Sequence, residues 1–290
     1  MTIASAARPA WRTAHGAIAL DRPVILGILN ASPDSFWSGG RIQHLDQALR
    51  HANQLIEEGA DALDVGGEST RPGATAVPAA EEAARVTPLV RAIARRWPSV
   101  PLSVDTVKAG VAQQAVEVGA WIVNDVSGLR LDAALGSVVA SQGAGIVLMH
   151  SRGGVDRMAG YDLATYGPDP VGDIAAELGD CIERARAAGI PDDAIVIDPG
   201  IGFSKRTEHS TAVIAGLDRF TALGFPILVG PSRKRFIGEI GGGLPPAERL
   251  EGTLAACVAA LDRGARIFRV HDVRAARRAL DVAWAIAGRS

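Results

Sequence analysis

Short apolar runs alternate with longer amphipathic stretches along almost the whole chain. The runs are rich in β-branched residues, apolar at consecutive positions and bounded by Gly, Pro or Asp, which is typical of parallel strands buried on both faces. We expect eight such strands, at "PVILGIL" (23–29), "ALDV" (62–65), "PLSV" (101–104), "WIVN" (121–124), "GIVLM" (145–149), "AIVI" (194–197), "FPILV" (225–229) and "RIFRV" (266–270).

The stretches between the runs have the apolar spacing of helices. Three similar phrases, "EEGADALDV", "EVGAWIVND" and "DRGARIFRV", each lead from the end of a helix into a strand. Eight strand–helix units predict an α/β fold, a single (β/α)8 barrel over residues 21–290, after an N-terminal arm or edge hairpin at residues 1–20. A doubly wound open sheet is the alternative, but no GxGxxG follows the first strand to support it.

Composition narrows the class of protein without identifying it. The chain has 290 residues, a net charge of −2 and a pI of about 6.3, which gives no global reason to expect nucleic acid or membrane partners. Cys181 and Cys257 lie far apart without CxxC spacing, which favours a reducing, cytoplasmic location over a disulfide scaffold or zinc site. The N-terminus has no signal-peptide pattern, and no apolar run reaches the ~18 residues of a membrane span.

Polar residues follow the expected strands at the end where a barrel of this kind carries its site. The segments are "NASPDSF" (30–36), "GGESTRPG" (66–73), "DTVK" (105–108), "NDVSG" (124–128), "HSRGG" (150–154), "DPGIGFSK" (198–205), "GPSRKR" (230–235) and, in the last unit, Arg269 and His271. An ordinary barrel rim is also polar. Here, however, the first residues after the strands are compact hydrogen-bonding groups, which favours a binding site.

These residues divide into two chemical groups. Asp105, Asn124, Asp198 and Lys234 suit a planar heterocycle with a guanidine-like edge, since a carboxylate accepts two parallel N–H bonds. Paired carboxylates also serve glycoside hydrolysis, but neighbouring cations depress the pKa of a general acid. The second group resembles an anion site with Arg forks suited to phosphate, and its members are Asn30, Arg71, Ser232, Arg233, Arg269 and His271.

Taken together, the segments resemble the dihydropteroate synthases of folate biosynthesis, in the pterin-binding group of TIM barrels. The matching pieces run in order from residue 26 to 273, and no single piece is specific. They are "GILNASPDSF", "DVGGESTRPGA", "SVDTVKAGVA", "NDVSGL", "VLMHSRG", "DPGIGF", "PILVGPSRKRFIG" and "RVHDV".

The resemblance implies the joining of p-aminobenzoate to 6-hydroxymethyl-7,8-dihydropterin pyrophosphate with Mg2+, and a homodimer. Residues implied to hold the pterin are Asp105, Asn124, Asp198, Lys234, Met149 and Phe203. Those implied to hold the pyrophosphate are Asn30, also the Mg2+ ligand, Arg71, Arg269 and His271. Those implied to frame p-aminobenzoate are Thr70, Pro72, Phe36, Ser232 and Arg233. The implied catalytic residues are Asp34, Lys234 and Arg71.

The chain departs from the family pattern at several loop positions. Trp37 and Ser38 stand where a small residue and Asp are usual, and Ser204 stands where Gly is usual. Ser151 and Pro231 are further departures. None removes a residue assigned to the pterin or the pyrophosphate. The changes therefore bear on loop closure, p-aminobenzoate affinity and sulfonamide sensitivity more than on the reaction.

Two rival functions share the barrel and the pterin pocket. A methyltetrahydrofolate:corrinoid methyltransferase has no use for a pyrophosphate site, so "SRK" and "RVH" argue against it. A catalytically silent pterin-binding paralogue does not need Asp34, Thr70 and Arg71, all of which are present.

Overall fold

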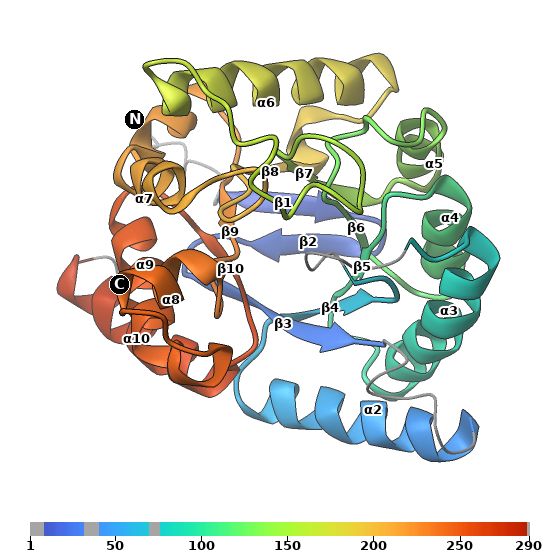
Figure 1. Ribbon diagram of the computed structural model, residues 1–290. Coiled ribbons are helices and arrows are strands. Elements are labelled where there is room, and N and C mark those ends of the chain that lie inside the picture. The colour runs from blue at the N-terminus through green and yellow to red at the C-terminus, as the bar shows by residue number, and fades with distance from the viewer. Residues whose placement is uncertain (1–8, 32–40, 70–75, 289–290) are drawn as a thin grey trace, which may run out of the picture.

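Eight parallel strands form the centre of the protein. A computed structural model describes residues 9–31, 41–69 and 76–288 (Figure 1). The strands are β3 (Val24–Asn30), β4 (Ala62–Gly66), β5 (Leu102–Asp105), β6 (Ile122–Asp125), β7 (Gly145–Met149), β8 (Ile195–Asp198), β9 (Leu228–Val229) and β10 (Ile267–Val270).

The strands form an almost closed ring. Their order is β8-β7-β6-β5-β4-β3-β10-β9, and a parallel bridge from Ile197 to Ile227 joins the two ends of this sheet. The predicted barrel is therefore confirmed, and the open doubly wound alternative is wrong. Because all eight strands run the same way, their carboxyl ends meet at one mouth.

Helices surround the strands and cover the outside of the barrel (Figure 1). They are α2 (Arg41–Glu57), α3 (Ala79–Arg96), α4 (Ala109–Glu117), α5 (Leu135–Gln142), α6 (Pro170–Ala187), α7 (Thr207–Ala215), α8 (Arg235–Ile240), α9 (Leu250–Asp262) and α10 (Val273–Ile286), with short 3-10 turns at Asp192–Ala194, Leu217–Leu223 and Pro246–Glu248. Within the described part of the chain, every helix is too short or too polar to cross a bilayer.

The three repeated phrases of the sequence form the same helix-to-strand turn. In each, a glycine with φ between 98° and 120° follows the helix, at Gly59, Gly119 and Gly264. The next residue, an alanine each time, donates its N–H to a carbonyl five residues earlier. A left-handed glycine satisfies the last helical carbonyls and turns the chain directly into the next strand.

A hairpin closes the amino end of the barrel, opposite the mouth. Its strands, β1 (Ala10–Thr13) and β2 (Gly16–Ala19), pair with each other rather than extending the eight-stranded sheet. Trp11 is fully buried among residues of the barrel interior, and its indole N–H donates to the Ala194 carbonyl at 2.9 Å. The expected edge hairpin is thus a plug that shares the core of the barrel.

Replacing Trp11 by Ala should destabilise the protein by about 3–5 kcal/mol, since it leaves a cavity at the base of the barrel. Trp11→Phe should cost less, because it keeps most of the ring and loses the hydrogen bond, worth about 1 kcal/mol. Urea unfolding followed by circular dichroism measures both. A Trp11→Ala protein within about 1 kcal/mol of wild type would show that the plug does not stabilise the barrel.

Candidate active site

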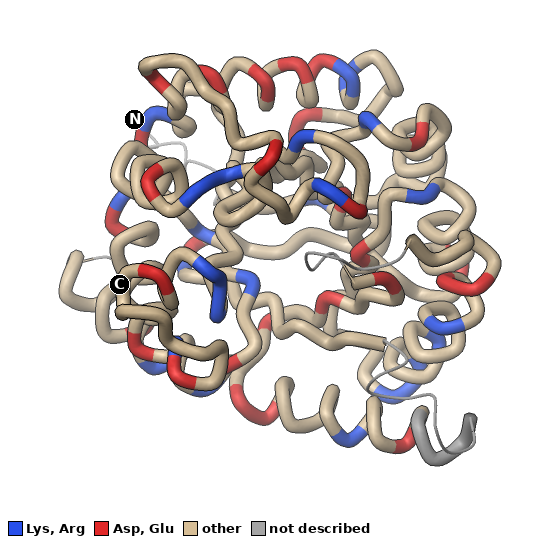
Figure 2. The backbone as a smooth tube through the Cα atoms, viewed as in Figure 1, with Lys and Arg blue, Asp and Glu red and all other residues tan. Residues whose placement is uncertain are grey.

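The strand register brings the polar residues of the sequence pattern to one level at the mouth. Asp105, the last residue of β5, pairs with Asn124 of β6, and Asp198, the last residue of β8, pairs with Met149 of β7. Lys234 precedes α8 and is the N-cap residue of that helix. Residues far apart in sequence therefore converge because parallel strands end together. Figure 2 shows basic and acidic residues around the centre of the ring of strands.

A buried ion-pair cluster lies inside this mouth. Arg269, from β10, donates through Nε to Asp64 Oδ2 at 2.5 Å and through Nη2 to Asp105 Oδ2 at 2.8 Å. Asn124 donates its amide to the same Asp64 oxygen at 3.2 Å. Asp64 is completely buried, and its Oδ1 has no hydrogen-bond partner among the described residues. One guanidinium thus joins β10 to β4 and β5 across the barrel.

Burial moves the pKa values of the acidic and basic groups in opposite directions. It raises the pKa of Asp105 to about 7, an effect that Arg269 opposes and Asp64 increases. It also raises the pKa of Asp198, against the attraction of Lys234. It lowers the pKa of Lys234 to about 8, which Asp198 opposes. Each charged form is desolvated here, so a ligand that supplies complementary hydrogen bonds stabilises all three.

An apolar wall adjoins these polar groups. Met149 and Met158 are buried with Val107 and Val126, and Phe203 packs against them from the loop after β8. The Lys234 ammonium lies 4.4 Å from the centre of the Phe203 ring and donates to the Ile201 carbonyl. A flat ligand that needs an apolar face and a hydrogen-bonding edge fits such a pair of surfaces.

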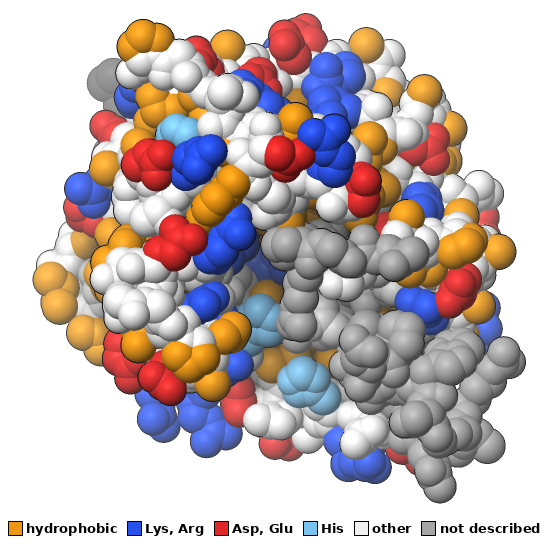
Figure 3. Space-filling model, viewed as in Figure 1, with side chains coloured by type: hydrophobic (Ala, Val, Ile, Leu, Met, Phe, Trp, Pro, Cys, Tyr) orange, Lys and Arg blue, Asp and Glu red, His pale blue; other side chains and the backbone are white. Residues whose placement is uncertain are grey.

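The predicted anion group lies partly apart from the ion-pair cluster. Ser232 Oγ is 3.0 Å from His271 Nδ1 and accepts the His271 backbone N–H at 3.2 Å. Arg233, at φ 56°, pairs with Asp272 through Nε at 2.8 Å and Nη2 at 2.5 Å. Asn30 ends β3 and is exposed. Figure 3 shows basic and histidine side chains close together near the centre of this face.

The guanidinium of Arg269, which was predicted for the anion group, pairs with Asp64 and with Asp105 of the predicted pterin group. Several predicted residues lie outside the described part of the chain, and their roles stay predictions: Asp34, Phe36, Trp37, Ser38, Thr70, Arg71 and Pro72.

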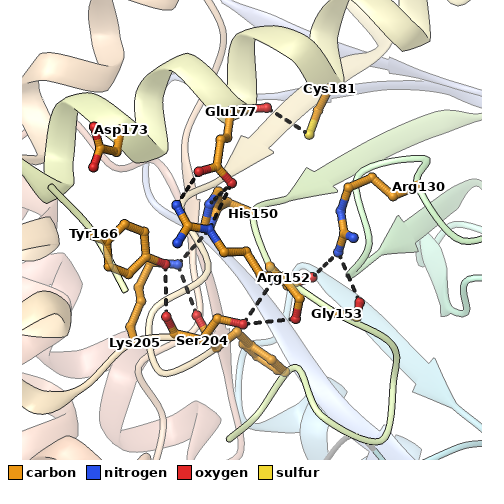
Figure 4. A network of polar contacts seen from close by, with 12 residues as sticks. Arg130, His150, Arg152, Gly153, Tyr166, Asp173, Glu177, Cys181, Ser204 and Lys205 are labelled. Carbon is orange, nitrogen blue, oxygen red and sulfur yellow. Dashed lines mark hydrogen bonds and ion pairs between the residues drawn. The ribbon is translucent and has the colours of Figure 1, made fainter. Parts of the chain in front are cut away.

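A second polar network lies beside the mouth (Figure 4). The Lys205 ammonium, from the loop after β8, is 2.7 Å from His150 Nδ1, just after β7. His150 Nε2 is 3.0 Å from Glu177 Oε2 on α6, and Arg152 pairs with the same carboxylate. Burial and nearby Lys205 lower the pKa of His150 to about 4, although Glu177 opposes the change.

Sequence reasoning assigned no role to Asp64, Lys205 or Glu177. The sequence does contain a feature that marks Asp64 and Lys205 as unusual. Asp64 is a charge inside the apolar run "ALDV", where a strand buried on both faces has no place for one without a partner. Lys205 is one of only three lysines in a chain that otherwise uses Arg. Glu177 has no such signal, since an acidic residue in an amphipathic helix is ordinary.

Comparison with known proteins identifies the family to which the chain belongs. Residues 26–271 match the family described as "Pterin binding enzyme". The dihydropteroate synthase of Bacillus subtilis is 43% identical over 254 residues, covering 88% of this chain and 85% of that protein. The chain belongs to the pterin-binding enzymes, among the dihydropteroate synthases.

Solved structures of dihydropteroate synthases agree with this placement. The Xanthomonas albilineans enzyme with 4-aminobenzoic acid has a TM-score of 0.88 and 42% identity, covering 97% of this chain and 98% of that one. The same enzyme in complex with 7,8-dihydropteroate has a TM-score of 0.83 and 38% identity, covering 96% and 98%.

One departure from the dihydropteroate synthase pattern has a clear structural basis. Ser204, which is expected to replace a glycine of the family pattern, has a φ of 47°, in the left-handed region that glycine adopts without strain. Its hydroxyl accepts the Arg152 N–H at 3.0 Å, and its backbone N–H donates to the Met158 carbonyl at 2.6 Å. The serine thus adds a hydrogen bond between the loops after β7 and β8.

The fold should lose stability as the pH falls from about 6.5 to about 4, because His150 is held neutral while the unfolded chain binds the proton. The full effect is on the order of 3 kcal/mol. Urea unfolding at both ends of this range should show a smaller loss in His150→Gln than in wild type. His15→Gln, on the exposed hairpin turn, is the control. Equal pH dependence in wild type and His150→Gln would contradict the prediction.

Proposed function

We propose that the barrel mouth joins 6-hydroxymethyl-7,8-dihydropterin pyrophosphate to p-aminobenzoate, giving 7,8-dihydropteroate and pyrophosphate, by a dissociative route. The observation that carries this proposal is the convergence of Asp105, Asn124, Asp198 and Lys234 beside an apolar wall. The enzyme is a transferase, as its place among the dihydropteroate synthases establishes.

Recognition of the pterin follows from the hydrogen-bonding character of these groups. The ring offers a guanidine-like edge of N–H donors, which suits the carboxylate of Asp198, and further donors and acceptors that suit Asp105 and Asn124. Lys234 donates from the opposite side and reaches the ring oxygen or nitrogen acceptors. Met149 and Phe203 cover the flat face of the ring, which is the part that water solvates least.

Pyrophosphate recognition uses the cationic groups of β10 and of the loop before α8. Arg269 presents a fork that matches phosphate oxygens, and His271 and Ser232 add donors. In this structure Arg269 pairs with Asp64 and Asp105. Occupancy by the pterin pyrophosphate therefore exchanges a carboxylate partner of Arg269 for a phosphate oxygen and leaves Asp105 to accept from the pterin.

The residues present fit Mg2+ as an ion that arrives with the substrate. Asn30 offers one hard amide oxygen at the mouth, and the described residues include no cluster of three His, Cys, Asp or Glu that could hold a metal by themselves. Mg2+ commonly keeps several waters and binds through one or two protein oxygens plus substrate phosphates. When bound, it neutralises charge on the leaving pyrophosphate.

The mechanism rests on leaving-group departure before the new bond forms. The C–O bond of the pterin methylene breaks as pyrophosphate leaves, and the electron-rich ring delocalises the resulting cation. Arg269 and His271 stabilise the charge that develops on the departing oxygens. The p-aminobenzoate amine then attacks the methylene and loses a proton. We assign Asp34 to stabilisation of the cation, Arg71 to the pyrophosphate, and Thr70, Pro72, Phe36, Ser232 and Arg233 to the p-aminobenzoate subsite.

A homodimer and a cytoplasmic location complete the proposal. Helix α10 exposes Val282 and Ile286, with 61% and 82% of their surface accessible, which supports a partner copy covering this face. Both cysteines are buried free thiols, which supports a reducing compartment. Sedimentation of the purified protein should give twice the mass of one chain, and a monomer at micromolar concentration would contradict the dimer.

Pyrophosphate release by the purified protein tests the proposed function. Release should require p-aminobenzoate and Mg2+, and chelation should abolish it reversibly. Lys234→Ala should lower kcat/KM about 100-fold or more, because it leaves Asp198 buried without its cation and removes a donor to the pterin.

Arg235→Ala is the matched control. Arg235 follows Lys234 directly but is exposed and stacks on the Tyr161 ring, 3.4 Å from its centre, so its loss should leave kcat/KM unchanged. Pterin binding without pyrophosphate release in wild type would favour the silent paralogue.

A further inference from the structure

Lys205 has no role in the proposed reaction, yet it is one of the most deeply buried side chains of the protein. Only 1% of its surface is exposed, and its ammonium turns back toward the barrel, 2.7 Å from His150 Nδ1 and 3.1 Å from the Phe203 carbonyl. Burying a lysine is costly, since an ammonium loses its hydration. A lysine kept in this place needs a structural or functional reason.

The network around Lys205 has a fixed direction. Glu177 accepts a hydrogen bond from His150 Nε2, so the neutral imidazole carries its proton there and offers Nδ1 as an acceptor to Lys205. The side chains of Glu177, His150 and Lys205 therefore form one chain of hydrogen bonds from helix α6 to the loop after β8 (Figure 4). We call this chain the amine brace.

The amine brace is attached to two residues of the pterin site through the backbone. His150 donates its N–H to the Asp198 carbonyl at 2.8 Å, and Lys205 donates to the Phe203 carbonyl. Gly200, between them, lies so close that a Cβ there would be 1.9 Å from the His150 carbonyl oxygen. The loop that carries Asp198 and Phe203 thus packs closely against the His150 backbone, at a distance that only glycine allows.

The same loop also sets the position of Lys234. Its ammonium lies over the Phe203 ring, and its stem passes Gly202, where a Cβ would be 2.9 Å from Lys234 Cδ. A displacement of the 198–205 loop would therefore disturb three pterin contacts together. It would leave the turn at Ser232 in place, because that turn is held by His271 and by the Thr253 hydroxyl, which accepts the Arg233 N–H.

We propose that Lys205 is a positioning residue for the pterin substrate: through His150 and Glu177 it fixes the backbone of Asp198 and Phe203, and it acts on the pterin subsite but not on the p-aminobenzoate subsite. This inference rests on the proposed function, since it assigns Asp198 and Phe203 to the pterin. This role differs from general stabilisation of the fold. A side chain that only stabilises the fold would not change the KM for one substrate and leave the KM for the other unchanged.

The test is a pair of KM values for Lys205→Met, which keeps the length of the side chain and removes the amine. The KM for 6-hydroxymethyl-7,8-dihydropterin pyrophosphate should rise about tenfold or more, since small misplacements of binding groups are costly. The KM for p-aminobenzoate should stay within about twofold, as expected for a subsite built from other loops. A proportionate rise in both KM values, or unchanged KM values with lower thermal stability, would overturn the proposal.

Arg130→Met is the matched control. Arg130 is an exposed cation of the loop after β6. It donates to Ser151 Oγ at 3.1 Å and to the Gly153 carbonyl at 3.3 Å, both on the loop after β7 that also carries His150. The variant removes a cationic side chain that contacts the loop of His150 without touching the amine brace, and both KM values should stay at the wild-type level. A tenfold rise in its pterin KM would overturn the specific role of Lys205.

Glu177→Gln keeps the test decisive if Lys205→Met does not fold. Glu177 is partly exposed, with 38% of its side chain accessible, and an amide there retains a hydrogen bond to His150 while losing the charge. The KM of this variant for the pterin substrate should also rise, by a smaller factor, and an unchanged value would overturn the proposal.

If wild type shows no turnover, the proposed function fails. Calorimetric affinities for the pterin in wild type and both variants then decide the role of Lys205 separately.

Discussion

Buried charge at the carboxyl ends of the strands is the constraint on which the rest of this structure depends. Arg269 is held between Asp64 and Asp105, so one guanidinium faces two carboxylates inside the barrel. The two carboxylates share this single guanidinium, and one oxygen of Asp64 has no hydrogen-bond partner among the described residues. Burying charges that are incompletely paired is costly, and a ligand that donates hydrogen bonds to these carboxylates offsets part of that cost.

The barrel makes this arrangement possible because its two ends differ. At the amino end the hairpin plug and its tryptophan fill the interior with apolar side chains, in addition to the larger core between the strands and the helices. At the carboxyl end each strand delivers a polar side chain to the same level, and the helices outside hold the strands in register. The inside of the barrel is therefore apolar at its amino end and carries the polar groups at its carboxyl end, where sites lie in this architecture.

The sequence predicted the architecture because eight apolar runs and the recurring helix-to-strand glycine turn are local signals. It also predicted that Asp105, Asn124 and Asp198 lie at the same end of the barrel, since parallel strands place their last residues together. The roles of these residues stay predictions. It did not predict that Arg269 pairs with Asp64, because that contact joins residues on β10 and β4, 205 positions apart, inside the barrel. The position of the hairpin was also not predicted, because a short alternating strand pair has the same pattern at a sheet edge as across the base of a barrel.

The sequence contains even less evidence for the amine brace. Lys205 and His150 were visible as polar residues after strands, but their partnership depends on the left-handed Ser204 and on the close approach of Gly200 to His150. These are properties of backbone geometry that no residue pattern expresses. Glu177 joins them only because α6 crosses the loops at this point (Figure 4).

The most direct test of the central claim is the affinity of 6-hydroxymethyl-7,8-dihydropterin pyrophosphate in the absence of p-aminobenzoate, measured by calorimetry for wild type and Asp198→Asn. The variant keeps the shape of the side chain and removes the negative charge that the guanidine-like edge requires. If the buried charges at the strand ends recognise the pterin, the dissociation constant should increase about 100-fold or more, as expected for loss of a desolvated charge-assisted pair. Equal affinities in the two proteins would show that the pterin binds elsewhere and would contradict this account of the site.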